Sequence, residues 1–119
     1  MTFRFEKLDV WQKAAEFAEL VYRVTRRFPE DERFGLTNQM RRAAVSVSSN
    51  IAEGQSRSSS KEMIRFVEIA YGSLMETVSQ SHIALRQQFL SEEQFGEIER
   101  LADDVARMLS GFRSRLSRD

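Results

Sequence analysis

The residues of this chain that could take part in catalysis or binding include polar side chains that recur at helical spacing. They fall in two segments and comprise Gln39, Ser46, Asn50, Glu53, Ser73 and Glu76. A carboxylate pair such as Glu53 and Glu76 could share the acid and base roles of a proton transfer. The alternative is a hydrogen-bonded network that fixes how two helices pack, because buried polar groups must be paired. No nucleophile or cofactor motif accompanies the two carboxylates, so the sequence favours the structural interpretation.

Motifs for metals, nucleophiles and phosphate loops are missing from the sequence. Carboxylate-bridged di-iron bundles need two Glu-x-x-His repeats, but the single histidine, His82, has Ser79 three residues before it. The chain has no cysteine for a thiolate site, no Gly-x-Ser-x-Gly elbow and no glycine-rich strand-to-helix turn. We therefore expect no catalytic residue, no metal, no cofactor and no enzymatic activity.

Arginine is the other candidate, because its guanidinium group matches phosphate and carboxylate geometry. The net charge is zero and the sequence pI is about 6.6, which argues against a general attraction to nucleic acid. In a bundle, basic residues would still gather at the two ends, and the candidate contacts to nucleic acid or a partner are Arg23, Arg26, Arg27, Arg41, Arg42, Arg57, Arg113 and Arg115. The alternative is that they offset helix dipoles and form surface ion pairs. In a ring, modest patches on several copies could together bind a phosphate backbone.

Four helices must position these residues, because apolar residues recur at spacings of three and four without sustained alternation. The predicted ranges are about 8–28, 37–53, 60–88 and 92–115. Short connections between helices favour antiparallel neighbours. The sequence therefore predicts an all-α fold, an antiparallel up-down-up-down four-helix bundle that forms a single domain over residues 1–119.

Capping residues and glycines mark several positions in these helices. Ser59 and Ser91 each precede a Glu or Gln by three positions, which is the spacing of a capping box. Gly54 is placed to be the residue beyond the C-cap of the second helix. We expect Gly72, inside the third helix, to let a neighbouring backbone or long side chain approach.

The first helix carries apolar or small residues on two adjacent seams. One seam contains Val10 and Phe28, and the second contains Trp11 and Tyr22. Extra apolar faces usually need a partner, so the predicted subunit interface comprises Phe3, Phe5, Trp11 and Tyr22. The alternative is that the second seam only widens the core stripe. Replacing Trp11 by a charged residue would distinguish an interface from a wider core stripe. Loss of assembly with helicity intact would support the interface, and global unfolding would support the core.

The bulk properties of the chain are those of a small cytoplasmic protein. At 119 residues and 13.8 kDa it is long enough for a core without disulfides or metals. No apolar run approaches the roughly 18 residues of a membrane span, and the N-terminus lacks the layout of a secretory signal. We expect a cytoplasmic location and no membrane partner.

Several segments together resemble one known family. They are residues 32–36, 39–44 and 50–54, with Gly72, Ser73 and Glu76. They resemble the 23S rRNA intervening-sequence proteins, also called S23-type four-helix bundle proteins, over nearly the whole chain. The resemblance implies a cytosolic bundle with no established enzymatic activity. A distant relative, the accessory protein of diversity-generating retroelements, is a ring of five bundles that binds reverse transcriptase and nucleic acid.

The predicted function is that of a non-enzymatic scaffold that assembles into a closed homo-oligomeric ring. The resemblance implies a homopentamer, with RNA, DNA or a reverse-transcriptase-like protein as further partner. The alternative is a monomeric or dimeric interaction module with no role on nucleic acid. Mass in solution separates the two, since five copies of 13.8 kDa amount to about 69 kDa.

Overall fold

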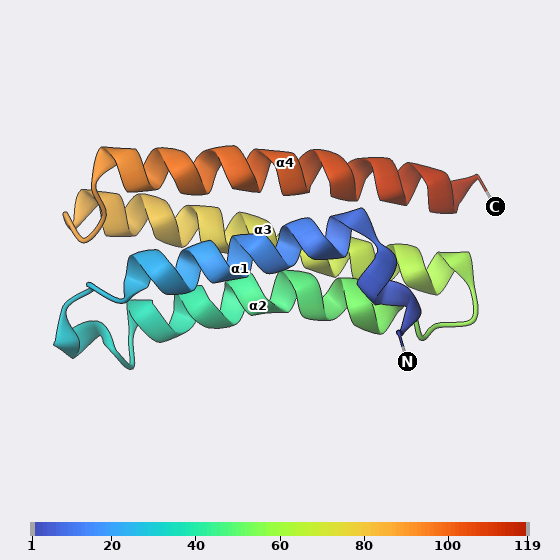
Figure 1. Ribbon diagram of the computed structural model, residues 1–119, viewed down its shortest axis with the longest axis horizontal. Helices are drawn as coiled ribbons and strands as arrows, with labels where there is room; N and C mark the ends of the chain where they lie inside the picture. The colour runs from blue at the N-terminus through green and yellow to red at the C-terminus, as the bar shows by residue number, and fades with distance from the viewer. Residues whose placement is uncertain (1, 119) are drawn as a thin grey trace.

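The computed structural model describes residues 2–118, which form four α-helices in a bundle (Figure 1). The helices are α1 (Asp9–Thr25), α2 (Leu36–Gly54), α3 (Ser60–Arg86) and α4 (Glu92–Ser117). Two short 3₁₀ helices, η1 (Arg4–Lys7) and η2 (Glu30–Glu32), precede α1 and α2. Each α-helix packs against two others, in the cyclic order α1, α2, α3, α4. Consecutive helices run in opposite directions along a molecule of 45 × 25 × 22 Å (Figure 1).

The core is built from the apolar stripe of every helix. Its largest fully buried side chains are Phe17, Met40, Ile51, Leu74, Ile98 and Leu109. Burying one such side chain stabilises the fold by about 1.5–3 kcal/mol. No helix within residues 2–118 combines the length and the apolar character that crossing a membrane requires.

Two helices end earlier than the sequence indicates, each for a local reason. Helix α1 ends at Thr25 rather than near residue 28, and a turn follows in which the Phe28 N–H donates to the Thr25 carbonyl. Helix α3 ends at Arg86 rather than at residue 88, because Gln88 adopts a left-handed conformation with φ of 66°. The N–H groups of Gln88 and Phe89 donate to Leu85 and Ala84, which is the Schellman pattern of a helix end.

The predicted capping box is complete at Ser91 and half formed at Ser59. The Ser91 hydroxyl accepts from the Gln94 N–H, and the Gln94 side chain accepts from the Ser91 N–H. At Ser59 the hydroxyl accepts from the Glu62 N–H, whereas the Glu62 carboxylate lies 3.5 Å from that hydroxyl. The start of α3 therefore uses only the serine half of the motif.

The two glycines singled out in the sequence have roles other than those predicted. Gly54 is the last residue of α2 and does not have a positive φ, so it is not a left-handed residue beyond the cap. A Cβ atom there would lie 2.9 Å from the Phe66 Cβ, so the glycine permits close approach of α2 and α3. A Cβ at Gly72 would meet no atom within 4 Å, which contradicts the close approach expected there.

Candidate functional site

The polar residues between α2 and α3 form a smaller cluster than predicted. The hydroxyls of Ser46 and Ser73 lie 2.9 Å apart, which joins the two helices. The Asn50 amide donates to the Ser46 hydroxyl at 2.9 Å and to the Ser46 carbonyl at 2.8 Å. All three side chains are half-buried, whereas Gln39 is exposed. Ser46, Asn50 and Ser73 thus tie α2 to α3.

The two carboxylates proposed for acid–base chemistry lie outside this cluster. Glu53 is exposed and pairs with Arg57 at 3.4 Å, and Glu76 is exposed and accepts from Gln80 at 3.3 Å. Ser46 lies opposite Ser73, so the antiparallel register places Glu53 level with residue 66. Glu76 is ten residues further along α3, a separation of roughly 15 Å along the axis. The two groups do not form a catalytic pair.

Arg41 is held by groups of α1. Its Nε donates to the Thr25 hydroxyl at 2.9 Å, and its Nη2 lies 3.4 Å from the Tyr22 carbonyl. The guanidinium carbon lies 4.7 Å from the centre of the Tyr22 ring, within the range of a cation–π contact. Arg41 is therefore a half-buried link between α1 and α2, with only part of its hydrogen-bonding capacity left for a partner.

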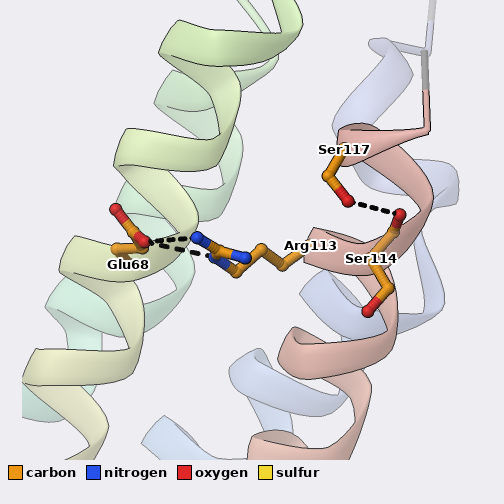
Figure 2. A network of polar contacts seen from close by, with 4 residues as sticks. All are labelled: Glu68, Arg113, Ser114 and Ser117. Atoms are coloured by element: carbon orange, nitrogen blue, oxygen red, sulfur yellow. Dashed lines mark hydrogen bonds and ion pairs between the residues drawn. The ribbon is translucent and has the colours of Figure 1, made fainter.

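Three other candidate arginines also contact groups of the same chain. Arg113 of α4 donates to Glu68 Oε2 of α3 through Nε at 3.1 Å and Nη2 at 2.8 Å (Figure 2). Arg57 lies 4.7 Å from the Phe66 ring centre, and Arg115 lies 5.7 Å from that of Phe112. These contacts lie within one chain, as in the alternative role that the sequence analysis gave for these arginines.

The remaining candidates, Arg23, Arg26, Arg27 and Arg42, are exposed and form no ion pair within residues 2–118. Arg26 and Arg27 lie in the turn after α1, where their charge faces the negative end of the helix dipole. Arg23 lies in the last turn of α1, in a groove shared with Glu97 and Asp104 of α4. Arg42 lies on α2, one residue beyond Arg41. The structure therefore divides the eight arginines into four that contact groups of the same chain and four that are exposed and form no ion pair within residues 2–118.

The four aromatic residues of the predicted interface lie in two separate places. Phe3 stacks on Phe5 with ring centres 6.5 Å apart, and Phe5 meets Trp11 edge-on at 5.0 Å. Trp11 is half-buried and packs against the core, while Tyr22 is exposed eleven residues further along α1, roughly 16 Å away. Arg4 of η1 donates to the Gln55 carbonyl at 2.9 Å, which fastens this segment to the end of α2.

Helix α3 carries exposed apolar residues that the sequence analysis did not single out. They are Ile69, Tyr71, Met75 and Ile83, each between 39% and 49% exposed. Their positions lie outside the apolar stripe that contains Val67, Ala70 and Leu74. Apolar residues outside that stripe are the sequence signal from which this exposed surface could have been predicted. Fourteen residues separate Ile69 from Ile83, so at 100° per residue both lie on nearly the same side of the helix.

Two surface grooves contain exposed apolar residues, and one of them includes Tyr71 and Met75 of α3. The α1–α2 groove, of about 530 Å³, is lined by Tyr22, Asn38, Arg41, Arg42, Val45, Ser46 and Ser49. The α3–α4 groove, of about 470 Å³, is lined by Tyr71, Met75, Val78, Glu99, Arg100, Ala102, Asp103 and Ala106. No cluster of three or more His, Cys, Asp or Glu residues that could hold a metal ion occurs in the described part of the chain.

Comparisons with known proteins identify a family and a shared fold. The family model described as 23S rRNA-intervening sequence protein matches residues 6–111. A crystal structure of a protein of unknown function from the S23 ribosomal protein family of Bacteroides thetaiotaomicron VPI-5482 is similar, with a TM-score of 0.78 and 23% identity over 87% of this chain and 97% of that chain. No curated protein matches the sequence. The likeness to the solved structure shows that the two chains share a fold.

Proposed function

The chain belongs to the 23S rRNA-intervening sequence protein family, and from that premise we propose that it is a non-enzymatic scaffold assembled from several copies. The resemblance to the five-membered ring of the retroelement accessory protein favours five copies. One observation carries the proposal: α3 presents apolar side chains to solvent as well as to the core. The family match confirms the resemblance noted in the sequence, and the assembly is our inference.

The exposed surface of α3 is unusual for a helix of a solitary bundle. Four of the eight exposed large apolar residues within residues 2–118 belong to it, namely Ile69, Tyr71, Met75 and Ile83. A surface helix of a monomeric protein normally turns a polar face to water. These four residues lie on two flanks of α3, Ile69 with Ile83 on one and Tyr71 with Met75 on the other. Exposed apolar surface of this kind marks an interaction site, because its burial against a partner is favourable. A second copy would remove this surface from water.

The chemistry of the exposed polar groups supports a non-enzymatic role. Glu53 and Glu76 are far apart and each is engaged by a neighbour four residues away. His82 is exposed, with its ring 4.7 Å from that of Phe95. A general acid or base needs a partner group within hydrogen-bond reach of a shared substrate. Neither Glu53, Glu76 nor His82 meets a nucleophile, so binding is the better supported activity.

The exposed arginines favour a nucleic-acid partner for the assembled scaffold. Arg26 and Arg27 lie together in the turn after α1 and form no ion pair in the part of the chain that the structure describes. Repeated on every copy of a ring, such a pair would contact several phosphates of one RNA or DNA strand. A reverse-transcriptase-like protein is the other partner that the resemblance implies.

The proposal is tested by the mass of the purified protein in solution. Light scattering should give about 69 kDa for five copies of 13.8 kDa, with Met75→Lys shifting the mass toward a single copy while helicity is unchanged. The matched control, Glu97→Lys, adds a lysine to α4 away from α3 and should leave the mass unchanged. A wild-type mass of 13.8 kDa at high concentration would contradict the proposal.

The same preparation tests the nucleic-acid partner. Binding of a labelled RNA should weaken steeply between about 50 and 300 mM salt, because counterions released from phosphates drive it. Substituting Arg26 and Arg27 with Gln should reduce both the affinity and the salt dependence, with the mass unchanged. Binding that is absent, or that does not vary with salt, would limit the scaffold to protein partners.

A further inference from the structure

The α1–α2 groove and the α3–α4 groove carry opposite charge. The residues that line the α1–α2 groove include Arg41 and Arg42 and no carboxylate. Those that line the α3–α4 groove include Glu99 and Asp103, with Arg100 as the basic member. Because the helices pack in the cyclic order α1, α2, α3, α4, the two grooves lie on opposite sides of the bundle. One molecule thus presents complementary surfaces that cannot meet each other.

The apolar content of the two grooves is also matched. Tyr22 and Val45 supply exposed apolar surface in the α1–α2 groove, and Tyr71 and Met75 supply it in the α3–α4 groove. Ala102 and Ala106 place small side chains along the α3–α4 groove, and small side chains allow two helices to pack at a shorter distance. Each groove therefore combines apolar and charged side chains, as interfaces do.

Most of these charges have no intramolecular ion pair. Arg42, Glu99 and Arg100 are exposed and form none within residues 2–118, whereas Asp103 pairs with Arg107 at 2.9 Å. Arg41 is already held against Tyr22 and Thr25, so it loses little side-chain entropy on contact. The exposed charges of opposite sign that could pair between the two grooves are therefore those of Arg42 and Glu99.

We propose that the α1–α2 groove of one copy binds the α3–α4 groove of the next copy, with Arg42 facing Glu99. The inference rests on the proposed function, because it names the surfaces through which the scaffold assembles. With extents of 45 × 25 × 22 Å, even the narrower long side of the bundle spans roughly 1,000 Å², which leaves room for the ~800 Å² per partner of a standard interface. The contact joins two different surfaces, so it repeats head to tail and either closes into a ring or continues as a filament.

Charge reversal tests this contact directly. Arg42→Glu and Glu99→Arg each place like charges across the interface, so each variant should fall to the 13.8 kDa of a single copy. The double variant Arg42→Glu/Glu99→Arg restores opposite charges at every contact and should recover the wild-type mass. A mixture of the two single variants should also associate beyond a single copy, because each can bind the other, but strict alternation cannot close a ring of five. Arg26→Glu and Glu97→Arg are controls that reverse charges outside both grooves and should keep the wild-type mass.

Each outcome has a distinct meaning. Single variants that keep the wild-type mass would overturn the groove contact while leaving the proposed function intact. Single variants that dissociate without rescue in the double variant would show that Arg42 and Glu99 do not face each other. A wild-type protein that is always a single copy would overturn the proposed function and this contact together. Should a reversal lose helicity, Arg42→Gln and Glu99→Gln replace it, and an affinity between copies weakened less than about tenfold contradicts the contact.

Discussion

Two glycines inside helices have opposite surroundings, and this difference predicts opposite effects of adding a methyl group. Gly54→Ala would place a Cβ 2.9 Å from the Phe66 Cβ, where neither backbone can easily give way. Such overpacking costs about 1–3 kcal/mol, and the better helix propensity of alanine offsets about 1 kcal/mol of it. We expect Gly54→Ala to lower the free energy of unfolding by up to about 2 kcal/mol in a urea titration.

Gly72→Ala is the matched control, because nothing lies within 4 Å of its added Cβ. Here only the helix propensity changes, so the free energy of unfolding should rise by up to about 1 kcal/mol. Two variants that shift in the same direction would contradict this explanation of Gly54. Loss of assembly in Gly72→Ala with a stabilised fold would place Gly72 in a contact between copies.

Individual residues of the candidate site could be predicted only where their neighbours lie on the same helix or directly across. Spacing alone brings Ser46 and Asn50 together, and the structure adds Ser73 from α3. The sequence did not reveal that Glu53 and Glu76 are separated, because that depends on the register between two helices. The close approach of Gly54 to Phe66, which reports that register, is a tertiary feature that no local pattern encodes.

The end of α3 contains a strained residue that should be easy to improve. Gln88 has φ of 66° in a Schellman pattern whose usual residue is glycine. A side chain in this conformation costs about 1 kcal/mol, which glycine avoids. We therefore expect Gln88→Gly to raise the free energy of unfolding by up to about 1 kcal/mol, measured by chemical denaturation.

Gln87 provides the control for this prediction, since it has φ of −82° and lies in the right-handed region. Gln87→Gly relieves no strain and makes the unfolded chain more flexible, so its stability should be unchanged or lower. An equal gain at both positions would show that backbone strain at Gln88 is not the cause. The comparison requires only two exposed side chains to be removed.

Helices were predictable as elements, because their apolar stripes extend over several turns. Their ends were less so: α3 stops two residues before the predicted end, because Gln88 turns left-handed without a glycine to announce it. The 3₁₀ helix η1 was missed altogether. In the structure, Arg4 of η1 contacts Gln55, which is distant in sequence, and Phe5 packs against Trp11 after the chain has turned into α1.

In the folded molecule, the apolar surface that favours assembly differs from the subunit interface that the sequence predicted. Trp11 belongs partly to the core and Phe3 and Phe5 gather around it, so these residues have an intramolecular role. Helix α3 carries the exposed apolar residues instead. The sequence could indicate that apolar surface exceeds what one core needs. Its location required the packing of all four helices.

Assembly through these surfaces should couple the stability of the fold to protein concentration. Copies that bind only when folded stabilise the native state by mass action, so a tenfold rise in concentration adds roughly 1 kcal/mol per chain. For a domain of this size that raises the thermal midpoint by about 4 °C. We expect the midpoint of the wild-type protein to rise with concentration, followed by circular dichroism at 222 nm. Arg42→Glu, as a single copy, should melt at one temperature throughout; a wild-type midpoint that does not vary would contradict assembly of folded copies.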